Sequence, residues 1–121
     1  MSGVQFEEWL AIRLREIGFT VSLTPTSRDG GIDLVATRED QLQIESKLLI
    51  QCKNHRDSVG VAVIRELRGV VPDRTSGTTP VVACPAGFTA DAISFADQHG
   101  MLLWGEDDLR QIENQASKSS G

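Results

Sequence analysis

The chain of 121 residues has little of what marks secreted, membrane-bound or zinc-binding proteins. Its two cysteines, together with an N-terminus that does not resemble an export signal, predict reduced thiols in a cytoplasmic protein. No apolar run approaches the length that spans a bilayer, so no membrane contact is predicted. The cysteines and histidines form no Cys-x-x-Cys or His-x-x-x-His pair, which argues against a zinc site.

The chain also lacks an excess of positive charge, because its net charge is −5. Contacts of Lys and Arg with phosphate dominate non-specific affinity for nucleic acids, so this balance argues against a free-standing, non-specific nucleic-acid binder. The acidity is uneven, however. Residues 1–75 have ten Lys and Arg against eleven Asp and Glu, whereas residues 76–121 have two against six. A local basic face within the first part is therefore compatible with the composition.

The length fits one domain with its own hydrophobic core. We expect this domain to cover residues 1–113. The last residues, 114–121, are polar and rich in serine, which predicts a disordered tail or a linker.

Hydrophobic periodicity predicts an alternation of helices and strands in the order αβββαβαβα. The short charged connection at 37–41 predicts that the second and third strands pair antiparallel, and the apolar strand 80–84 is typical of a buried parallel strand. The sequence therefore predicts an α/β fold, with a central mixed β-sheet flanked by helices. Helices are predicted over 4–17, 59–71, 88–99 and 106–115, and strands over 19–23, 32–36, 43–53, 80–84 and 101–104.

Three polar side chains stand where packing alone would favour apolar ones. Asp33 interrupts the strand 32–36 directly after two glycines, and Gln51 and Lys53 end the apolar run of the strand 43–53. Residues two apart on a strand point to the same side, so we expect Gln51 and Lys53 to face one pocket. An unpaired carboxylate on a partly buried face is costly, so Asp33 needs a partner or a metal ion.

These residue types suit the hydrolysis of a phosphodiester. A divalent cation neutralises phosphoryl oxygens and lowers the pKa of the attacking water, and Mg²⁺ prefers oxygen ligands. Asp33, the side-chain carbonyl of Gln51 and the main-chain carbonyl of Cys52 can supply such oxygens. Lys53 can hold the attacking water or stabilise charge at the phosphorus. Glu7, on the first predicted helix, can reach the same metal directly or through water.

Each of these residues also has a purely structural interpretation. Asp33 can flank a turn and accept hydrogen bonds from backbone amides, and Lys53 with Asn54 can be a solvated strand end. Asp29 can form the turn or act as a second metal ligand. His55 can lie in a loop or contact DNA.

The segments that carry these residues resemble, in order, the Mrr-type branch of the restriction-endonuclease-like nucleases, also called PD-(D/E)xK nucleases. QFEEWL is similar to a Phe-Glu helix motif, SRDGGIDLVA to a glycine-rich turn into Gly-Ile-Asp, and LLIQCKN to a Gln-x-Lys strand. VIRELRGV resembles the helix that follows, and TPVVACPAGFTADAISFADQHGMLLW resembles the closing β-α-β segment. The likeness runs from about residue 5 to 110.

The resemblance implies a restriction-endonuclease-like fold and a Mg²⁺-dependent DNA endonuclease, with Mn²⁺ as a possible substitute. It makes Asp33 the metal-binding aspartate, Lys53 the catalytic lysine and Glu7 an accessory acid. Gln51 takes the place that most of the superfamily gives to Glu or Asp. The implied role is the restriction of modified or foreign DNA, and the implied partner is double-stranded DNA. We expect a homodimer or a part of a larger multidomain protein.

Polar residues that border this site are candidates for contacts with DNA. The arginines three apart on the predicted helix 59–71 can meet phosphates, although such pairs are commonly a solvated helix face. The candidates are Ser27, Arg28, Asn54, Arg65 and Arg68.

Two other functions stay open. Glutamine in place of a carboxylate removes one negative charge from the metal site, so the domain can be a nuclease-like module that binds DNA or a protein without cutting. A Holliday-junction resolvase would use the same chemistry on branched DNA. It would need a basic dimer surface, which an acidic chain supplies poorly.

Overall fold

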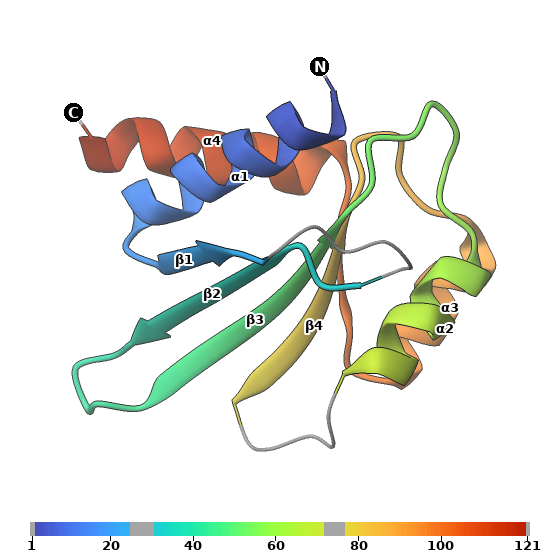
Figure 1. The fold of residues 1–121 in the computed structure, drawn as a ribbon, viewed down its shortest axis with the longest axis horizontal. Helices are drawn as coiled ribbons and strands as arrows, with labels where there is room; N and C mark the ends of the chain where they lie inside the picture. Colours follow the sequence, from blue (N-terminus) through green and yellow to red (C-terminus); the bar gives the residue numbers. More distant parts are fainter. Residues whose placement is uncertain (1, 25–30, 72–76, 121) are drawn as a thin grey trace.

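The computed structural model describes residues 2–24, 31–71 and 77–120 (Figure 1). The order of its helices and strands confirms the predicted αβββαβαβα arrangement. The elements are α1 (Gly3–Ile17), β1 (Thr20–Leu23), β2 (Leu34–Glu39), β3 (Glu45–Cys52), α2 (Val61–Val70), β4 (Thr78–Ala83), α3 (Ala90–Gln98), β5 (Leu102–Trp104) and α4 (Glu106–Ser120).

The strands form a mixed sheet in the order β1-β2-β3-β4-β5. The pairs β1–β2 and β2–β3 are antiparallel, and the pairs β3–β4 and β4–β5 are parallel. The predicted antiparallel pairing of the second and third strands and the predicted buried parallel strand are both confirmed. All four residues from Pro80 to Ala83 are buried, as expected of a central strand with neighbours on both sides.

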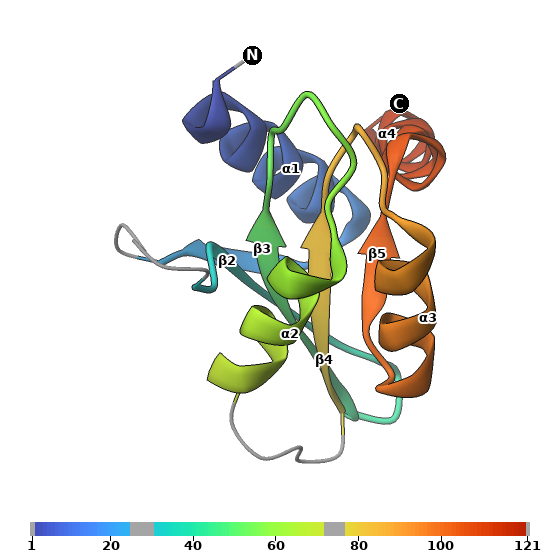
Figure 2. The same ribbon diagram turned by 90° about the vertical axis from the view of Figure 1, so that its right-hand side faces the viewer.

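Helices cover both faces of the sheet (Figures 1 and 2). The crossovers β3-α2-β4 and β4-α3-β5 advance in the same direction, and the right-handed rule therefore places α2 and α3 on one face. The helices α1 and α4 cover the other face. The core under α1 and α4 includes Leu10, Leu14 and Ile50, and the core under α2 and α3 includes Ile64 and Val82.

The first helix shows how local sequence signals set the ends of an element. Ser2 caps α1 by accepting a hydrogen bond from the Gln5 N–H, and the Gln5 side chain accepts one from the Ser2 N–H. Gly18 ends the helix with a φ of 116°, a left-handed conformation that glycine adopts without strain. These caps set the ends of α1, and its buried residues, such as Leu10 and Leu14, pack it onto the sheet.

Most bounds differ from the predicted ones by one or two residues. The exception that matters for the domain organisation is α4, which continues to Ser120, so residues 114–120 are helical where the sequence predicted a tail or linker. The extension contains Ala116, which is 1% exposed, and α4 packs alongside α1. Tertiary packing therefore stabilises a helical segment that the polar sequence does not predict. None of the described helices is long and apolar enough to cross a bilayer.

Candidate active site

Asp33 lies just before β2, not inside it as predicted, and its carboxylate is bonded to the next strand. Oδ2 of Asp33 accepts a hydrogen bond from the Cys52 N–H at 2.8 Å. The main chain of Asp33 is also held, because its N–H donates to the Ile50 carbonyl at 2.8 Å and its carbonyl accepts from the Thr24 N–H at 2.9 Å. The carboxylate is thus fixed at the end of β3.

A local irregularity explains why strict alternation does not predict where Asp33 points. The register pairs Ile50 with Leu34, yet the Asp33 N–H also donates to the Ile50 carbonyl. Two successive residues therefore stand opposite one, which is the arrangement of a β-bulge. Bulges redirect side chains and are frequent beside active sites. Strict alternation would place Asp33 on the same face as Val35, whereas the bulge turns its carboxylate toward Cys52 and Glu7 on α1.

Glu7 reaches the same place from α1. Burial raises the pKa of Glu7 from 4.5 to about 7, together with the charge of Asp33, a hydrogen bond with the Asp33 side chain and the charge of Glu8. Two carboxyl groups that share a hydrogen bond cannot both ionise freely. Such a pair is a ready acceptor for a cation, which would relieve the repulsion.

Gln51 approaches the end of β3 from the other face of the sheet. The register pairs Gln51 with Val82, which belongs to the core under α2 and α3, whereas Ile50 pairs with Val81 under α1 and α4. The Gln51 side chain is only 2% exposed, and its Oε1 has no hydrogen-bond partner. A buried carbonyl oxygen without a partner is costly and calls for a ligand or water.

Lys53 follows β3 directly and is half-buried. Its N–H donates to the Ala83 carbonyl at 2.8 Å, which fixes its main chain against β4. If the alternation of β3 continues past Cys52, the Lys53 side chain lies on the same side as that of Gln51. Within the described part of the chain, no hydrogen bond or ion pair joins the ammonium group of Lys53 to Asp33 or to another residue. The lysine thus directly follows Cys52, whose N–H binds Asp33, and its charge is not neutralised by an ion pair in the described residues.

Cys52 contributes its main chain and not its thiol. Burial, reinforced by the charges of Asp33 and Glu7, raises the pKa of the Cys52 thiol well above its ordinary value. A neutral thiol is a poor metal ligand and a poor nucleophile. In an extended strand the N–H and C=O of one residue point to the same side, so the Cys52 carbonyl faces the same way as the N–H that Asp33 accepts.

The oxygen atoms at this end of β3 fit a divalent metal ion. The fit rests on the kinds of group present: the unpartnered Oε1 of Gln51, and the carboxyls of Glu7 and Asp33, whose interaction helps to raise the pKa of Glu7. Among the described residues, no group of three or more His, Cys, Asp or Glu side chains is placed to hold a metal. Amide and main-chain oxygens would therefore complete the set, as hard cations such as Mg²⁺ allow.

The residues predicted to contact DNA differ in where they lie and in whether they are engaged within the chain. Ser27 and Arg28, together with Asp29, lie outside the described residues. Asn54 is exposed directly after Lys53, and Arg68 is exposed on α2. Arg65 is also exposed, but its guanidinium lies over the Phe95 ring, 5.6 Å from the centroid, so it is engaged within the chain.

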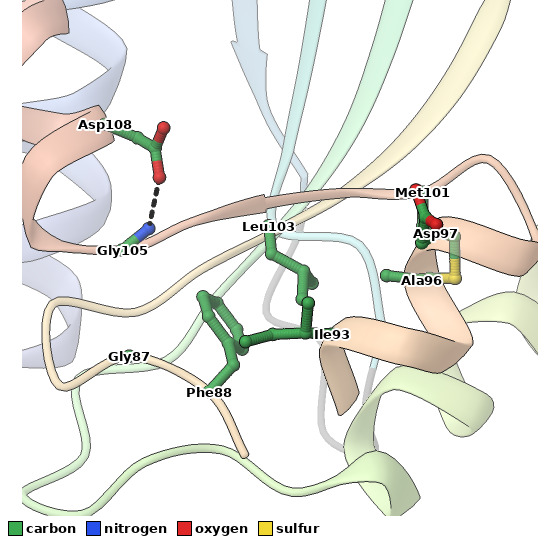
Figure 3. A pocket seen from close by; sticks show the side chains of 9 residues that line it. All are labelled: Gly87, Phe88, Ile93, Ala96, Asp97, Met101, Leu103, Gly105 and Asp108. Atoms are coloured by element: carbon green, nitrogen blue, oxygen red, sulfur yellow. Dashed lines mark hydrogen bonds between the residues drawn. The ribbon is translucent and has the colours of Figure 1, made fainter. Parts of the chain in front are cut away.

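A separate cavity of about 400 Å³ lies between α3, β5 and the start of α4 (Figure 3). Its lining includes Phe88, Ile93 and Leu103, whose side chains converge in the picture. Asp108, on its rim, accepts a hydrogen bond from the Gly105 N–H at 3.0 Å and so caps the start of α4. None of the predicted catalytic residues lines this cavity.

The fold is that of the restriction-endonuclease-like nucleases, as similar solved structures show. The DNA modification-dependent restriction endonuclease AspBHI superposes with a TM-score of 0.65 at 18% sequence identity, over 96% of this chain and 35% of that one. The MspJI restriction endonuclease, solved in complex with a 27-mer oligonucleotide, gives a TM-score of 0.59 at 21% identity, over 96% of this chain and 29% of that one. At these identities the likeness establishes the fold.

Family membership follows from the sequence. Residues 1–112 match the family model Mrr_cat, described as a restriction endonuclease, and the chain belongs to this family. Restriction-endonuclease-like domains generally depend on a divalent metal ion. The uncharacterized mitochondrial protein C824.03c of Schizosaccharomyces pombe is 28% identical over 93 residues, which cover 75% of this chain and 38% of that protein. The chain thus spans less than half the length of each of these three relatives.

Proposed function

We propose that this domain is a Mg²⁺-dependent endonuclease that hydrolyses phosphodiester bonds in double-stranded DNA. One observation carries the proposal. At the end of β3, the carboxylate of Asp33 accepts a hydrogen bond from the main chain of Cys52 and interacts with Glu7, and the buried Oε1 of Gln51, one residue before Cys52, has no hydrogen-bond partner. Membership in the restriction endonuclease family supports the same conclusion.

The residues at the end of β3 have two roles, which are to hold the metal and to stabilise negative charge on the substrate. Asp33 is the central ligand, because its hydrogen bond to the Cys52 N–H holds the carboxylate in place before metal arrives. Gln51 Oε1 and the Cys52 carbonyl are neutral ligands, and Glu7 adds a second carboxylate when it loses its proton. The bound metal would supply charge neutralisation at the phosphoryl oxygens and a lower pKa for the attacking water.

Lys53 has a different task, because it bears the positive charge nearest to these ligands in the chain. It orients the attacking water or stabilises the negative charge that builds on the phosphoryl oxygens. Since no carboxylate in the described part of the chain forms an ion pair with Lys53, its charge is available to the substrate.

The substrate we propose is modified or foreign DNA in a restriction system. AspBHI is described as DNA modification-dependent, and MspJI was solved with an oligonucleotide, which supports a substrate of this class. The chain covers between 29% and 56% of the similar solved chains. We propose that the domain acts as a homodimer or as part of a larger multidomain protein. Mn²⁺ is expected to replace Mg²⁺, because it accepts the same oxygen ligands.

Cleavage of plasmid DNA tests the proposal. Supercoiled plasmid, methylated and unmethylated, and a branched duplex are each incubated with the protein in Mg²⁺, in Mn²⁺ or in EDTA. Asp33→Asn and Lys53→Ala are each expected to lower the cleavage rate by at least about a hundredfold. Lys47→Ala is the matched control, because Lys47 is also half-buried on β3 but pairs with Thr78 at the opposite end of the strand. It is expected to cut like the wild type.

The outcomes separate the candidate functions. Full activity of Asp33→Asn or Lys53→Ala, with melting curves like the wild type, would reject the assignment of that residue. Binding of DNA without cleavage in either metal would favour a non-cleaving module. Cleavage confined to a branched duplex would favour a junction resolvase.

A further inference from the structure

Most arginines in the described part of the chain have partners within the chain. Two arginines form ion pairs, Arg13 with Glu16 and Arg110 with Glu106 and Asp107. Two lie over aromatic rings, Arg38 over Phe19 and Arg65 over Phe95. Arg15 donates a hydrogen bond to the Val21 carbonyl. Five cationic side chains in this part have no hydrogen bond, ion pair or ring contact within the chain: Lys47, Lys53, Arg56, Arg68 and Lys118.

Arg56 is the available arginine that lies nearest in sequence to the candidate active site. It follows Lys53 by three residues and is exposed. Asp57 is adjacent in sequence, yet no ion pair joins the two side chains in the described structure. The guanidinium of Arg56 is therefore free to meet an anion, and a guanidinium binds phosphate with two parallel hydrogen bonds.

The loop that carries Arg56, residues 54–58, is exposed along its whole length but fixed at both ends. At one end the Lys53 N–H donates to the Ala83 carbonyl at 2.8 Å. At the other end the Val59 N–H donates to the Gly87 carbonyl at 2.8 Å, and the Val59 carbonyl accepts from the Thr89 N–H at 3.0 Å. Val59 is 2% exposed. A short loop with anchored ends loses little entropy when it binds a ligand.

The 54–58 loop also lies at the correct end of the molecule. It rises from the end of β3, and both views place it at the same end as the first turns of α1, where Glu7 lies (Figures 1 and 2). DNA with its scissile phosphate at Lys53 would therefore pass close to this loop. In a chain with a net charge of −5, attraction of the DNA backbone depends on such local cations.

We propose that the 54–58 loop holds the DNA backbone beside the scissile bond and that Arg56 binds a neighbouring phosphate. This inference rests on the proposed function, and it assigns Arg56 as a positioning residue that acts by orienting the substrate. Contacts with phosphate position DNA without reading its sequence, so the effect of Arg56 is the same for every sequence.

Measuring DNA binding tests this role of the loop. Fluorescence anisotropy reports binding to a duplex of about 30 base pairs, in EDTA and at several salt concentrations. Arg56→Ala is expected to weaken binding about fivefold and to lower the slope of log Kd against log salt by about one. Arg56→Lys keeps the charge and is expected to restore the slope. Lys118→Ala is the matched control, because it removes the same charge from an exposed side chain at the far end of α4 and should bind like the wild type.

Cleavage kinetics and thermal melting complete the test. Arg56→Ala is expected to raise KM and leave kcat unchanged, with a melting temperature like that of the wild type, because the residue acts on binding. A wild-type salt slope in Arg56→Ala, or an equal loss in Lys118→Ala, would overturn the role of the loop while DNA cleavage by the wild type stands. A wild type that neither binds nor cuts DNA would overturn both the loop and the proposed function.

Discussion

The burial of Glu7 next to Asp33 makes the stability of the metal-free protein depend on pH. Burial and Asp33 raise the pKa of Glu7 from 4.5 to about 7 in the folded protein. The folded state therefore keeps a proton on Glu7 at pH values where the unfolded chain has lost it. The stability that comes from the raised pKa of Glu7 is fully present below pH 4.5 and is lost as the pH rises through about 7. Glu7→Gln removes the titrating carboxyl, so this variant should not lose that stability as the pH rises.

The size of the effect follows from the pKa. A rise from 4.5 to about 7 corresponds to about 3 kcal/mol without screening, at roughly 1.4 kcal/mol for each pH unit. Glu7 is only half-buried, and solvent screens part of this energy, so we expect about 1 to 2 kcal/mol. For a domain of this size, that corresponds to about 3 to 8 °C in melting temperature.

Thermal unfolding in EDTA between about pH 4.5 and pH 8 measures the effect. Wild type and Glu7→Gln are expected to melt alike at the acid end, and Glu7→Gln is expected to be the more stable at the alkaline end. Glu8→Gln is the control, because Glu8 is exposed and adjacent on α1. Excess Mg²⁺ at the alkaline end should recover the loss in the wild type. Parallel pH profiles of wild type and Glu7→Gln would refute the acidic pair.

Three further substitutions test the framework. Gly77→Ala should lower the unfolding free energy in urea by about 1 to 3 kcal/mol, because Gly77 has a φ of 92° and an added Cβ would lie 2.8 Å from the Glu45 carbonyl. Ser2→Ala should lower it by about 1 kcal/mol by removing the cap that Gln5 completes. Gln51→Glu should destabilise the metal-free protein and enlarge the rise in melting temperature that Mg²⁺ produces, because it places a carboxyl at a position that is only 2% exposed and that we propose to hold the metal.

The element order could be predicted from the sequence because each element carries a local signal. The apolar stripe of α1, its cap at Ser2 and its stop at Gly18 depend on neighbours a few residues away. The buried parallel strand β4 could be predicted from the apolar run that starts at Pro80. The end of α4 could not be predicted, because its polar last turns are helical through packing beside α1, which is a contact between distant parts of the chain.

The candidate site divides in the same way. Residue type and spacing are local signals, and they were enough to predict that Gln51 and Lys53 point to one side, that Asp33 needs a partner, and that the chain resembles the Mrr-type nucleases. The bulge opposite Ile50 has no such local signal; it takes Asp33 out of strict alternation and sets its carboxylate against the Cys52 N–H and toward Glu7. The reason is physical, because a bulge and the interaction of two carboxyls arise from the pairing of segments that the sequence keeps far apart.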